Sequence, residues 1–198
     1  MIHEINEQGN VEFKIIGFLD DDEGAFNVNK SKYGYQEPYL GKLQTARYYL
    51  ENLFVPCFSK LDVRSDFINS DMRLKFATII HPSSVISANA EIGEGNIIYP
   101  FCVIGSNAAI GRCNILTSFS FISHDCRVGC NNFFSTAGLA GNVVVGDSNF
   151  FGIRATVVPS TQIGSNNIIQ AGMVINNHVS NNETVFYKHK EKINVIRC

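Results

Sequence analysis

The sequence lacks a surplus of positive charge. Its 16 Lys and Arg residues stand against 18 Asp and Glu residues, so the formal net charge at pH 7 is −2. Because binding to a phosphate backbone depends on a basic surface, we expect no nucleic-acid partner. The chain has 198 residues, of which 45% are hydrophobic and 17% charged. It is therefore too apolar to be disordered and can bury a sizeable core.

The sequence also lacks a long apolar run, an apolar N-terminus and paired cysteines. No stretch approaches the roughly 18 apolar residues of a membrane span. The first twelve residues hold three Glu and no apolar run, which excludes a signal peptide and predicts a cytoplasmic protein. No CxxC pair occurs, so we expect reduced thiols and no metal site. The six cysteines are Cys57, Cys102, Cys113, Cys126, Cys130 and Cys198.

Charge is distributed unevenly along the chain. Residues 1–78 hold 21 of the 34 charged residues, residues 79–180 hold seven, and residues 181–198 hold six. This change predicts three regions: a small domain over residues 1–78, a second domain over 79–180, and a C-terminal tail over 181–198.

The first region has the pattern of a small α/β domain. Apolar runs at residues 13–19 and 53–58 predict strands, the second of them at a sheet edge because it contains Pro56. The apolar spacing at residues 43–50 and 60–75 predicts helices. Such alternation favours a small parallel sheet.

The second region carries a six-residue repeat. Stepping by six from Ile80 reaches an aliphatic residue or Phe each time, up to Phe134. The phase then slips by one residue and resumes from Leu139 to Ile175. The fifth residue of each unit is usually small: Ala90, Cys102, Ala108, Ser120, Cys126, Gly138 and Ala155.

A period of six fits neither an α-helix nor an amphipathic strand. It fits a solenoid of short strands and corners, in which three units close a coil of about 18 residues. The aliphatic residue then points inward, and the small residue occupies a second inward position. Gly and Asn are frequent because corners need unusual backbone angles.

Several segments beside the repeat carry a family resemblance. They are Phe18-Leu19-Asp20-Asp21-Asp22, Tyr39-Leu40-Gly41, Ile79-Ile80-His81-Pro82-Ser83, Ser123-His124-Asp125-Cys126, Leu139-Ala140-Gly141-Asn142-Val143 and Gln170-Ala171-Gly172-Met173-Val174. In these segments the chain resembles sugar O- and N-acetyltransferases of the NeuD/PglD type, within the hexapeptide-repeat acyltransferases. The resemblance implies a left-handed parallel β-helix preceded by a small Rossmann-like α/β domain.

The resemblance also implies the activity. We expect a homotrimer that uses acetyl-coenzyme A, with the active site between neighbouring coils and the α/β domain binding a nucleotide sugar. The preferred substrate is the amine of a nucleotide-linked 4-amino-4,6-dideoxy sugar, for surface polysaccharide or glycan synthesis. The alternative is O-acetylation of a sialic acid or a related sugar.

The chain departs from the family pattern at two places. Family members open with a strand and a glycine-rich turn that approaches the nucleotide phosphates, and this sequence has neither, so the sheet is expected to lack its central strand. The family also often has a second His where this sequence has Phe133. We therefore expect a reshaped pocket wall beside the acetyl group.

Acetyl transfer needs a base for the attacking amine or hydroxyl, and the pKa of His suits that task. Of the five His residues, only His124 lies within the body of the coils, at a position that should point outward. We expect it to be the general base, and the resemblance assigns Asp125 to orient or polarise it.

The remaining site predictions also come from the resemblance. Gly141 is expected to offer its amide N–H to the acetyl carbonyl, where an oxyanion donor is needed. The backbone of Ile153, Ala171 and Gly172 is expected to line the pantetheine arm of the coenzyme. Asp20 and Asp21 follow the first apolar run and are expected to contact the nucleoside of the substrate.

Two alternative hypotheses assign the protein to other functional classes. A zinc enzyme on the same solenoid, such as a γ-type carbonic anhydrase, needs about three His ligands on adjacent coils, and only His124 is present there. A non-catalytic solenoid for binding or scaffolding gains support from the missing first strand. Binding of coenzyme A would argue against it.

Overall fold

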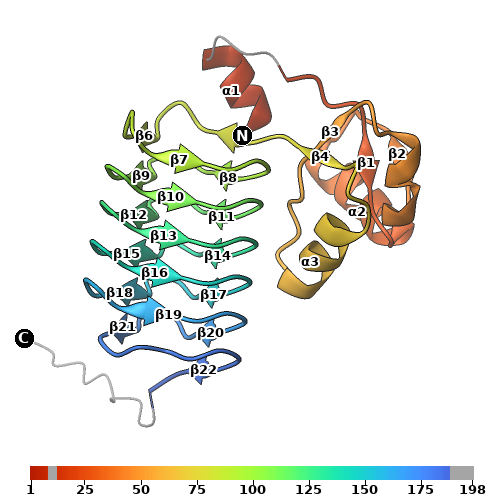
Figure 1. The fold of residues 1–198 in the computed structure, drawn as a ribbon. Coiled ribbons are helices and arrows are strands. Elements are labelled where there is room, and N and C mark those ends of the chain that lie inside the picture. Colours follow the sequence, from red (N-terminus) through yellow and green to blue (C-terminus); the bar gives the residue numbers. More distant parts are fainter. Residues whose placement is uncertain (9–12, 188–198) are drawn as a thin grey trace, which may run out of the picture.

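The computed structural model describes residues 1–8 and 13–187, and most of them form a stack of coils (Figure 1). Each coil contributes two-residue strands to three parallel sheets, which have seven, six and five strands. Most neighbouring strands within a sheet are separated by 18 residues in the sequence, as in the pairing of Ile97 with Ile115. The architecture is therefore a parallel β-helix, as the six-residue repeat predicts.

The strands of the β-helix follow one another around the three sheets. The seven-stranded sheet contains β5 (Ile79–Ile80), β8 (Ile97–Ile98), β11 (Ile115–Leu116), β14 (Phe133–Phe134), β17 (Phe150–Phe151), β20 (Ile168–Ile169) and β22 (Thr184–Val185). The six-stranded sheet contains β6 (Val85–Ile86), β9 (Val103–Ile104), β12 (Phe121–Ile122), β15 (Gly138–Leu139), β18 (Thr156–Val157) and β21 (Val174–Ile175). The five-stranded sheet contains β7 (Glu91–Ile92), β10 (Ala109–Ile110), β13 (Arg127–Val128), β16 (Val144–Val145) and β19 (Gln162–Ile163).

The repeated aliphatic residues fill the inside of the coils. Ile104, Leu116 and Ile122 are almost fully buried, and the rings of Phe134 and Phe151 stack with their centroids 4.6 Å apart. Small residues such as Cys102 and Ala108 occupy the second inward position and are also buried. One continuous core therefore runs along the axis of the β-helix, built from the alternation of large and small inward residues.

The phase slip in the repeat corresponds to one short coil. Phe121 pairs with Gly138, only 17 residues later. The small inward residue of this coil is the buried Ala137, whereas Gly138 occupies the outward strand position beneath the ring of Phe121. The expectation that Gly138 is the small inward residue is therefore wrong, because the unit that begins at Phe134 has lost one residue.

A column of buried asparagines stands where the five-stranded sheet turns into the seven-stranded sheet. Its members are Asn96, Asn114, Asn132, Asn149 and Asn167, all fully buried. Each side-chain oxygen from Asn96 to Asn149 accepts the backbone N–H of the next member, and the first four amide groups also donate to carbonyl oxygens of glycines. We call this column the asparagine ladder, and it joins successive coils at this corner.

The N-terminal region contains short elements beside the coils (Figure 1). They are α1 (Ile2–Gln8), β1 (Phe18–Leu19), α2 (Glu23–Tyr33), β2 (Tyr39–Gly41), the 3-10 helix η1 (Leu43–Tyr48), β3 (Leu53–Phe54), α3 (Leu61–Asn69) and β4 (Lys75–Phe76). The strands are shorter than the predicted runs 13–19 and 53–58, and the predicted helix 60–75 ends at Asn69. Helix α2 was not predicted, because only Phe26 of its residues is buried and no apolar stripe marks it.

The predicted small parallel sheet is divided in two. Strand β1 pairs with β2, and β3 pairs with β4, both in parallel. Among the described residues, no strand joins β1 to β3. The two pairs therefore remain separate two-stranded sheets instead of one sheet.

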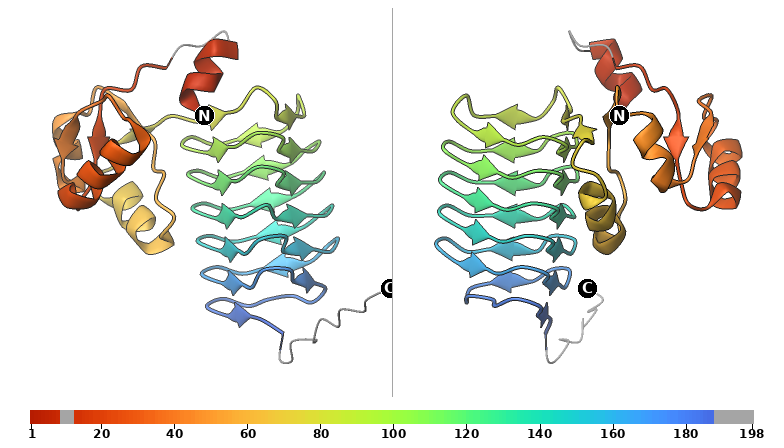
Figure 2. Two further views of the ribbon diagram at one scale, coloured as in Figure 1. Left: turned by 180° about the vertical axis from the view of Figure 1, so that it is seen from behind. Right: turned by 45° about the vertical axis from the view of Figure 1, so that its right-hand side comes forward.

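The N-terminal region docks on the seven-stranded sheet side of the β-helix (Figure 2). Arg64 of α3 is fully buried and donates from Nε to Asn131 Oδ1 at 2.6 Å and from Nη2 to the carbonyl oxygens of Asn131 and Asn132. Its Nη1 donates to the carbonyl oxygen of Phe58. Burial lowers the pKa of the guanidinium to about 10. Arg64 thus connects α3 directly to a corner of the β-helix.

The β-helix extends beyond the predicted boundary at residue 180. Strand β22 pairs with β20, with Ile168 opposite Thr184 and Ile169 opposite Val185. The predicted tail 181–198 therefore begins inside the last coil. Residues 188–198 of that tail, Cys198 among them, lie outside the described residues.

Candidate active site

His124 lies at the corner between the six-stranded and the five-stranded sheet. It follows β12, and the next residue, Asp125, takes a left-handed backbone conformation with φ 60°. The N–H of Asp125 donates to the carbonyl oxygen of Ser106 on the preceding coil, which holds the corner in place. The side chains of His124 and Asp125 are 60% and 44% exposed. The expected outward orientation of His124 is thus confirmed.

His124 and Asp125 form a pair. Nδ1 of His124 lies 2.8 Å from Oδ2 of Asp125, and the other carboxylate oxygen accepts from Asn107 Nδ2 at 3.1 Å. The hydrogen bond from His124, and next the one from Asn107, lower the pKa of the Asp125 carboxyl. An ionised Asp125 only accepts hydrogen bonds, so it favours the His124 tautomer with the proton on Nδ1. Nε2 then carries the free lone pair that a general base needs.

Gly141 lies directly beneath the imidazole ring, on the next coil. A Cβ atom at this position would be 2.5 Å from His124 Cε1 and 2.6 Å from Nε2. The backbone joins the two coils here, because the N–H of Asn142 donates to the carbonyl oxygen of His124 at 3.0 Å. Among the described residues, the N–H of Gly141 has no acceptor. The structure thus brings together the imidazole ring of His124, the carboxylate of Asp125 and the free backbone N–H of Gly141.

The predicted pantetheine positions lie at another corner. Ile153 precedes β18, and Ala171 and Gly172 precede β21, so all three stand at the opposite edge of the six-stranded sheet from His124. The N–H of Gly172 donates to the carbonyl oxygen of Ile153 at 2.8 Å. Gly172 has φ +73° with no atom near its Cβ direction, and Ile153 is 58% exposed. Within one chain, these residues and His124 therefore form two separate groups.

Each carboxylate of the run Asp20-Asp21-Asp22 accepts a hydrogen bond from a backbone N–H. Oδ1 of Asp20 accepts from Asp22, Oδ1 of Asp21 accepts from Leu43 at the start of η1, and Oδ1 of Asp22 accepts from Ala25 as the N-cap of α2. One oxygen of each carboxylate is left over from these bonds. The N-terminal region lies beside the seven-stranded sheet (Figure 1), whereas the His124 corner joins the other two sheets.

Phe133 lies on the outer face of the seven-stranded sheet. Its ring stacks on Phe150 with centroids 5.3 Å apart. Because the His124 corner belongs to the other two sheets, Phe133 does not stand beside His124 of the same chain. The histidine that precedes Pro82, His81, is buried and accepts the N–H of Ser83, as a structural residue would.

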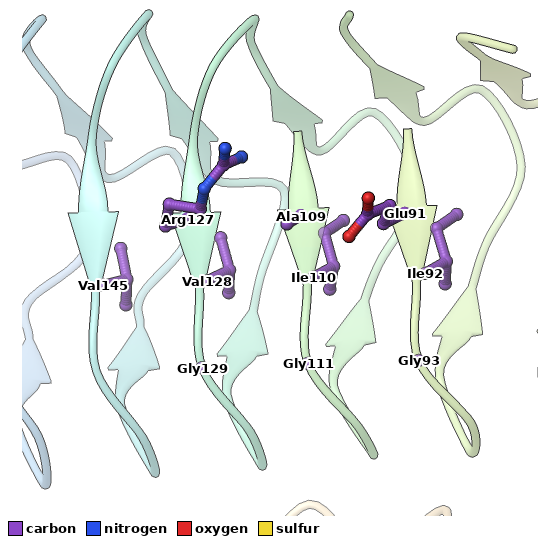
Figure 3. Close-up of a pocket in the computed structure, with 10 residues that line it drawn as sticks. All are labelled: Glu91, Ile92, Gly93, Ala109, Ile110, Gly111, Arg127, Val128, Gly129 and Val145. Atoms are coloured by element: carbon purple, nitrogen blue, oxygen red, sulfur yellow. The ribbon is translucent and has the colours of Figure 1, made fainter. Parts of the chain in front are cut away.

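A shallow hollow lies over the five-stranded sheet, next to the His124 corner. Figure 3 shows Ala109 of β10 between Glu91 of β7 and Arg127 of β13. Arg127 Nη1 donates to the carbonyl oxygen of Asn107 at 2.6 Å. None of the predicted site residues lines this hollow.

Across residues 1–8 and 13–187, no three or more His, Cys, Asp or Glu side chains gather so that they could hold a metal ion. No helix in the described part of the chain is long and apolar enough to cross a membrane.

Comparison with known proteins gives structural neighbours. PerB from Caulobacter crescentus, crystallised with CoA and GDP-perosamine, aligns with a TM-score of 0.69 at 28% identity and covers 73% of each chain. The acetyltransferase domain of PglB from Neisseria gonorrhoeae FA1090 aligns with a TM-score of 0.67 at 23% identity, over 75% of this chain and 76% of that one. WeeI from Acinetobacter baumannii AYE aligns with a TM-score of 0.65 at 18% identity, over 82% and 90%.

The chain has the fold of the hexapeptide-repeat sugar acetyltransferases. These neighbours confirm the predicted left-handed β-helix, and the perosamine N-acetyltransferase of Caulobacter crescentus, at 27–28% identity, confirms the predicted class of acyltransferase. No protein-family model and no curated protein sequence matches the chain. The likeness to PglB and WeeI concerns the fold alone.

Sequence reasoning missed Asn107 and the asparagine ladder. Asn107 precedes Asp125 by one coil of 18 residues, a spacing that the six-residue repeat already contains. The sequence signal was the recurrence of Asn at equivalent units, which was interpreted only as a preference for corner backbone angles.

Proposed function

We propose that the protein is an acetyl-CoA-dependent N-acetyltransferase acting on the amine of a nucleotide-linked 4-amino-4,6-dideoxy sugar, in surface polysaccharide or glycan synthesis. The observation that carries the proposal is the His124–Asp125 pair above the free amide of Gly141. PerB, which shares this fold at 28% identity, was crystallised with CoA and GDP-perosamine.

The chemistry follows from the three groups at the corner. Nε2 of His124 takes a proton from the sugar amine as the amine nitrogen attacks the thioester carbonyl carbon of acetyl-CoA. The N–H of Gly141 donates to the developing oxyanion. The C–S bond then breaks, the thiolate of CoA takes up a proton, and the sugar keeps the acetyl group as an amide.

A single chain leaves this site open. His124 is 60% exposed on a convex corner, and acyl transfer benefits from the exclusion of water. The outer face of the six-stranded sheet, between the His124 corner and the Ile153 corner, exposes Val85, Val103 and Phe121. We propose that copies of the chain assemble as a homotrimer and cover this apolar face, because soluble proteins rarely leave such patches free.

The same assembly would join the two halves of the coenzyme site. In one chain, Ile153, Ala171 and Gly172 stand across the sheet from His124. In the homotrimer, the pantetheine arm of acetyl-CoA would lie along these residues of one copy and reach His124 and Gly141 of the next. The free N–H groups of Ile153 and Ala171 support this role, since neither has an acceptor among the described residues.

Asp20 and Asp21 are the proposed contacts for the nucleoside of the substrate. The turn that contains them is held by its own hydrogen bonds, so the remaining carboxylate oxygens are presented on an ordered backbone. Replacing both by Asn should raise the KM of the sugar substrate and leave the KM of acetyl-CoA unchanged. An unchanged substrate KM would contradict this role.

The test combines substrates and one variant. The protein is mixed with acetyl-CoA and UDP-, dTDP- and GDP-linked 4-amino sugars, together with free and CMP-linked sialic acid, and thiol release is followed. Turnover on an amino sugar that falls about 100-fold or more in His124→Ala, with the assembly intact, is the expected result. Turnover only on a sialic acid would replace the proposal by O-acetylation. Binding of neither CoA nor any sugar would favour a non-catalytic solenoid.

A further inference from the structure

A line of side-chain hydrogen bonds runs down the His124 corner over successive coils. Ser87 Oγ donates to Asn89 Oδ1 at 2.7 Å, Asn89 Nδ2 donates to Asn107 Oδ1 at 2.6 Å, and Asn107 Nδ2 donates to Asp125 Oδ1 at 3.1 Å. Asn89, Asn107 and Asp125 are equivalent residues, 18 apart, so the coil spacing itself aligns them. The line ends at Oδ2 of Asp125, against His124 Nδ1.

The direction of this line is determined by its last member. An ionised Asp125 carboxylate only accepts hydrogen bonds, so Asn107 turns its NH₂ group toward Asp125 and its oxygen toward the amide group of Asn89. The oxygen of Asn89 then faces the hydroxyl of Ser87, which donates to it. Asp125 receives a donor on Oδ1, which leaves Oδ2 to face the imidazole.

The backbone of Asn107 is held as well. Its φ is 58°, a left-handed conformation that Asn tolerates better than most residues. Arg127 Nη1 donates to its carbonyl oxygen at 2.6 Å. Both ends of the residue are thus tied to the corner that carries the His124–Asp125 pair.

We propose that Asn107 is a positioning residue for acetyl transfer, whose amide holds Asp125 so that the carboxylate orients His124 with Nε2 free. The proposal rests on the proposed function, because it assumes that His124 is the base. It extends the His124–Asp125 pair to a line of hydrogen-bonded side chains that begins two coils earlier, at Ser87. Asn107 does not itself touch the substrates in this arrangement.

The test uses two substitutions at one position. Asn107→Gly keeps the left-handed backbone and removes the amide. Asn107→Asp keeps the shape and places a carboxylate against Asp125. Asn166→Gly is the matched control, because Asn166 is also an exposed corner Asn, with φ 60°, and it lies at a different corner.

For Asn107→Gly, kcat should fall about tenfold, since a misoriented base loses much of its contribution. The KM of acetyl-CoA and the melting temperature should stay close to those of the Asn166→Gly control. Equal kcat values for Asn107→Gly and wild type would overturn the proposal. A loss of kcat that Asn166→Gly shares would also overturn it, by indicating a general effect of corner asparagines.

For Asn107→Asp, the pH profile of kcat/KM supplies a second readout. Besides His124, the charged group that acts on the Asp125 carboxyl is Arg127. Its positive charge partly compensates the negative charge that Asn107→Asp adds. An added carboxylate favours the protonated imidazole, so the acid limb of the profile should move to higher pH by about half a unit. An unmoved limb would overturn the proposal. Full activity in His124→Ala would instead refute the proposed function, which separates the two failures.

Discussion

At the scale of single residues, the candidate site depends on the absence of a side chain at Gly141. The ring of His124 occupies the space in which a Cβ of Gly141 would lie. Gly141 has no positive φ, so its backbone conformation does not require glycine. The position requires glycine for a steric reason, because the imidazole ring of His124 lies so close. The close approach also leaves its N–H open beside the imidazole of His124.

This contact makes Gly141→Ala a direct test of the corner. The added methyl group should push the imidazole off Asp125, and turnover should fall at least about tenfold while the β-helix stays folded. Kinetics and a melting curve check this. Gly93→Ala is the control, because its Cβ would also strike the next coil, at 2.8 Å from the carbonyl oxygen of Gly111, far from any imidazole. A loss of turnover equal to that in the control would contradict the assignment.

The sequence predicted part of this site and not the rest, for a physical reason. The position of His124 in its unit was enough to predict that it points outward, since a repeat determines the direction of every side chain. The contact with Gly141 depends on a coil shortened by one residue, and the support from Asn107 depends on which neighbours stack on Asp125. Both contacts depend on the register between neighbouring coils, and the sequence of one strand alone does not determine that register.

At the scale of elements, the asparagine ladder links successive coils at one corner through side-chain hydrogen bonds. Asn132 donates to Asn114 Oδ1 and to the carbonyl oxygen of Gly146, and its own oxygen accepts from the backbone and side chain of Asn149. Asn167 is the last member, and its Nδ2 has no partner among the described residues. The ladder is therefore fully bonded in the middle and incomplete at its end.

This difference predicts unequal effects on stability. Asn132→Ala leaves several buried polar groups without partners and should lower the free energy of unfolding by about 2–4 kcal/mol. Asn167→Ala removes one bond, from the N–H of Glu183, and an amide that already lacks a partner, so it should cost about 1 kcal/mol. Urea denaturation of the two variants checks the order. Equal losses would mean that the ladder does not act through its hydrogen bonds.

The elements of the two regions differ in how well the sequence predicted them. The coil strands follow from a pattern repeated many times, each unit supporting the others. The N-terminal helices have no such support, and α2 buries only Phe26, so its main sequence signal is the cap at Asp22. Asp22, the last of three consecutive aspartates, was not recognised from the sequence as the start of a helix.

At the scale of the whole molecule, the N-terminal region contacts the β-helix through two apolar clusters and a set of hydrogen bonds. The cluster around Phe67 and Phe76 includes Cys113 from the coils, and the cluster around Ile5 includes Ile79 of β5. Arg64 adds buried hydrogen bonds to this contact, with the oxygens of Asn131 and Asn132 as acceptors. A buried guanidinium in this position is stable only while these acceptors stay in place.

The position of the N-terminal region should therefore depend on Arg64. Arg64→Leu removes three hydrogen bonds to the coil and leaves buried oxygens unpaired, at a cost of about 3 kcal/mol. Because the β-helix core does not include Arg64, proteolysis should then degrade the N-terminal region first and leave the coils intact. The substrate KM should rise, since Asp20 and Asp21 move with that region, while the KM of acetyl-CoA stays constant. Arg73→Leu is the control, because Arg73 is an exposed residue paired with Asp71 on the same region. If Arg64→Leu and Arg73→Leu behaved alike in both assays, the connection would have to reside in the apolar contacts alone.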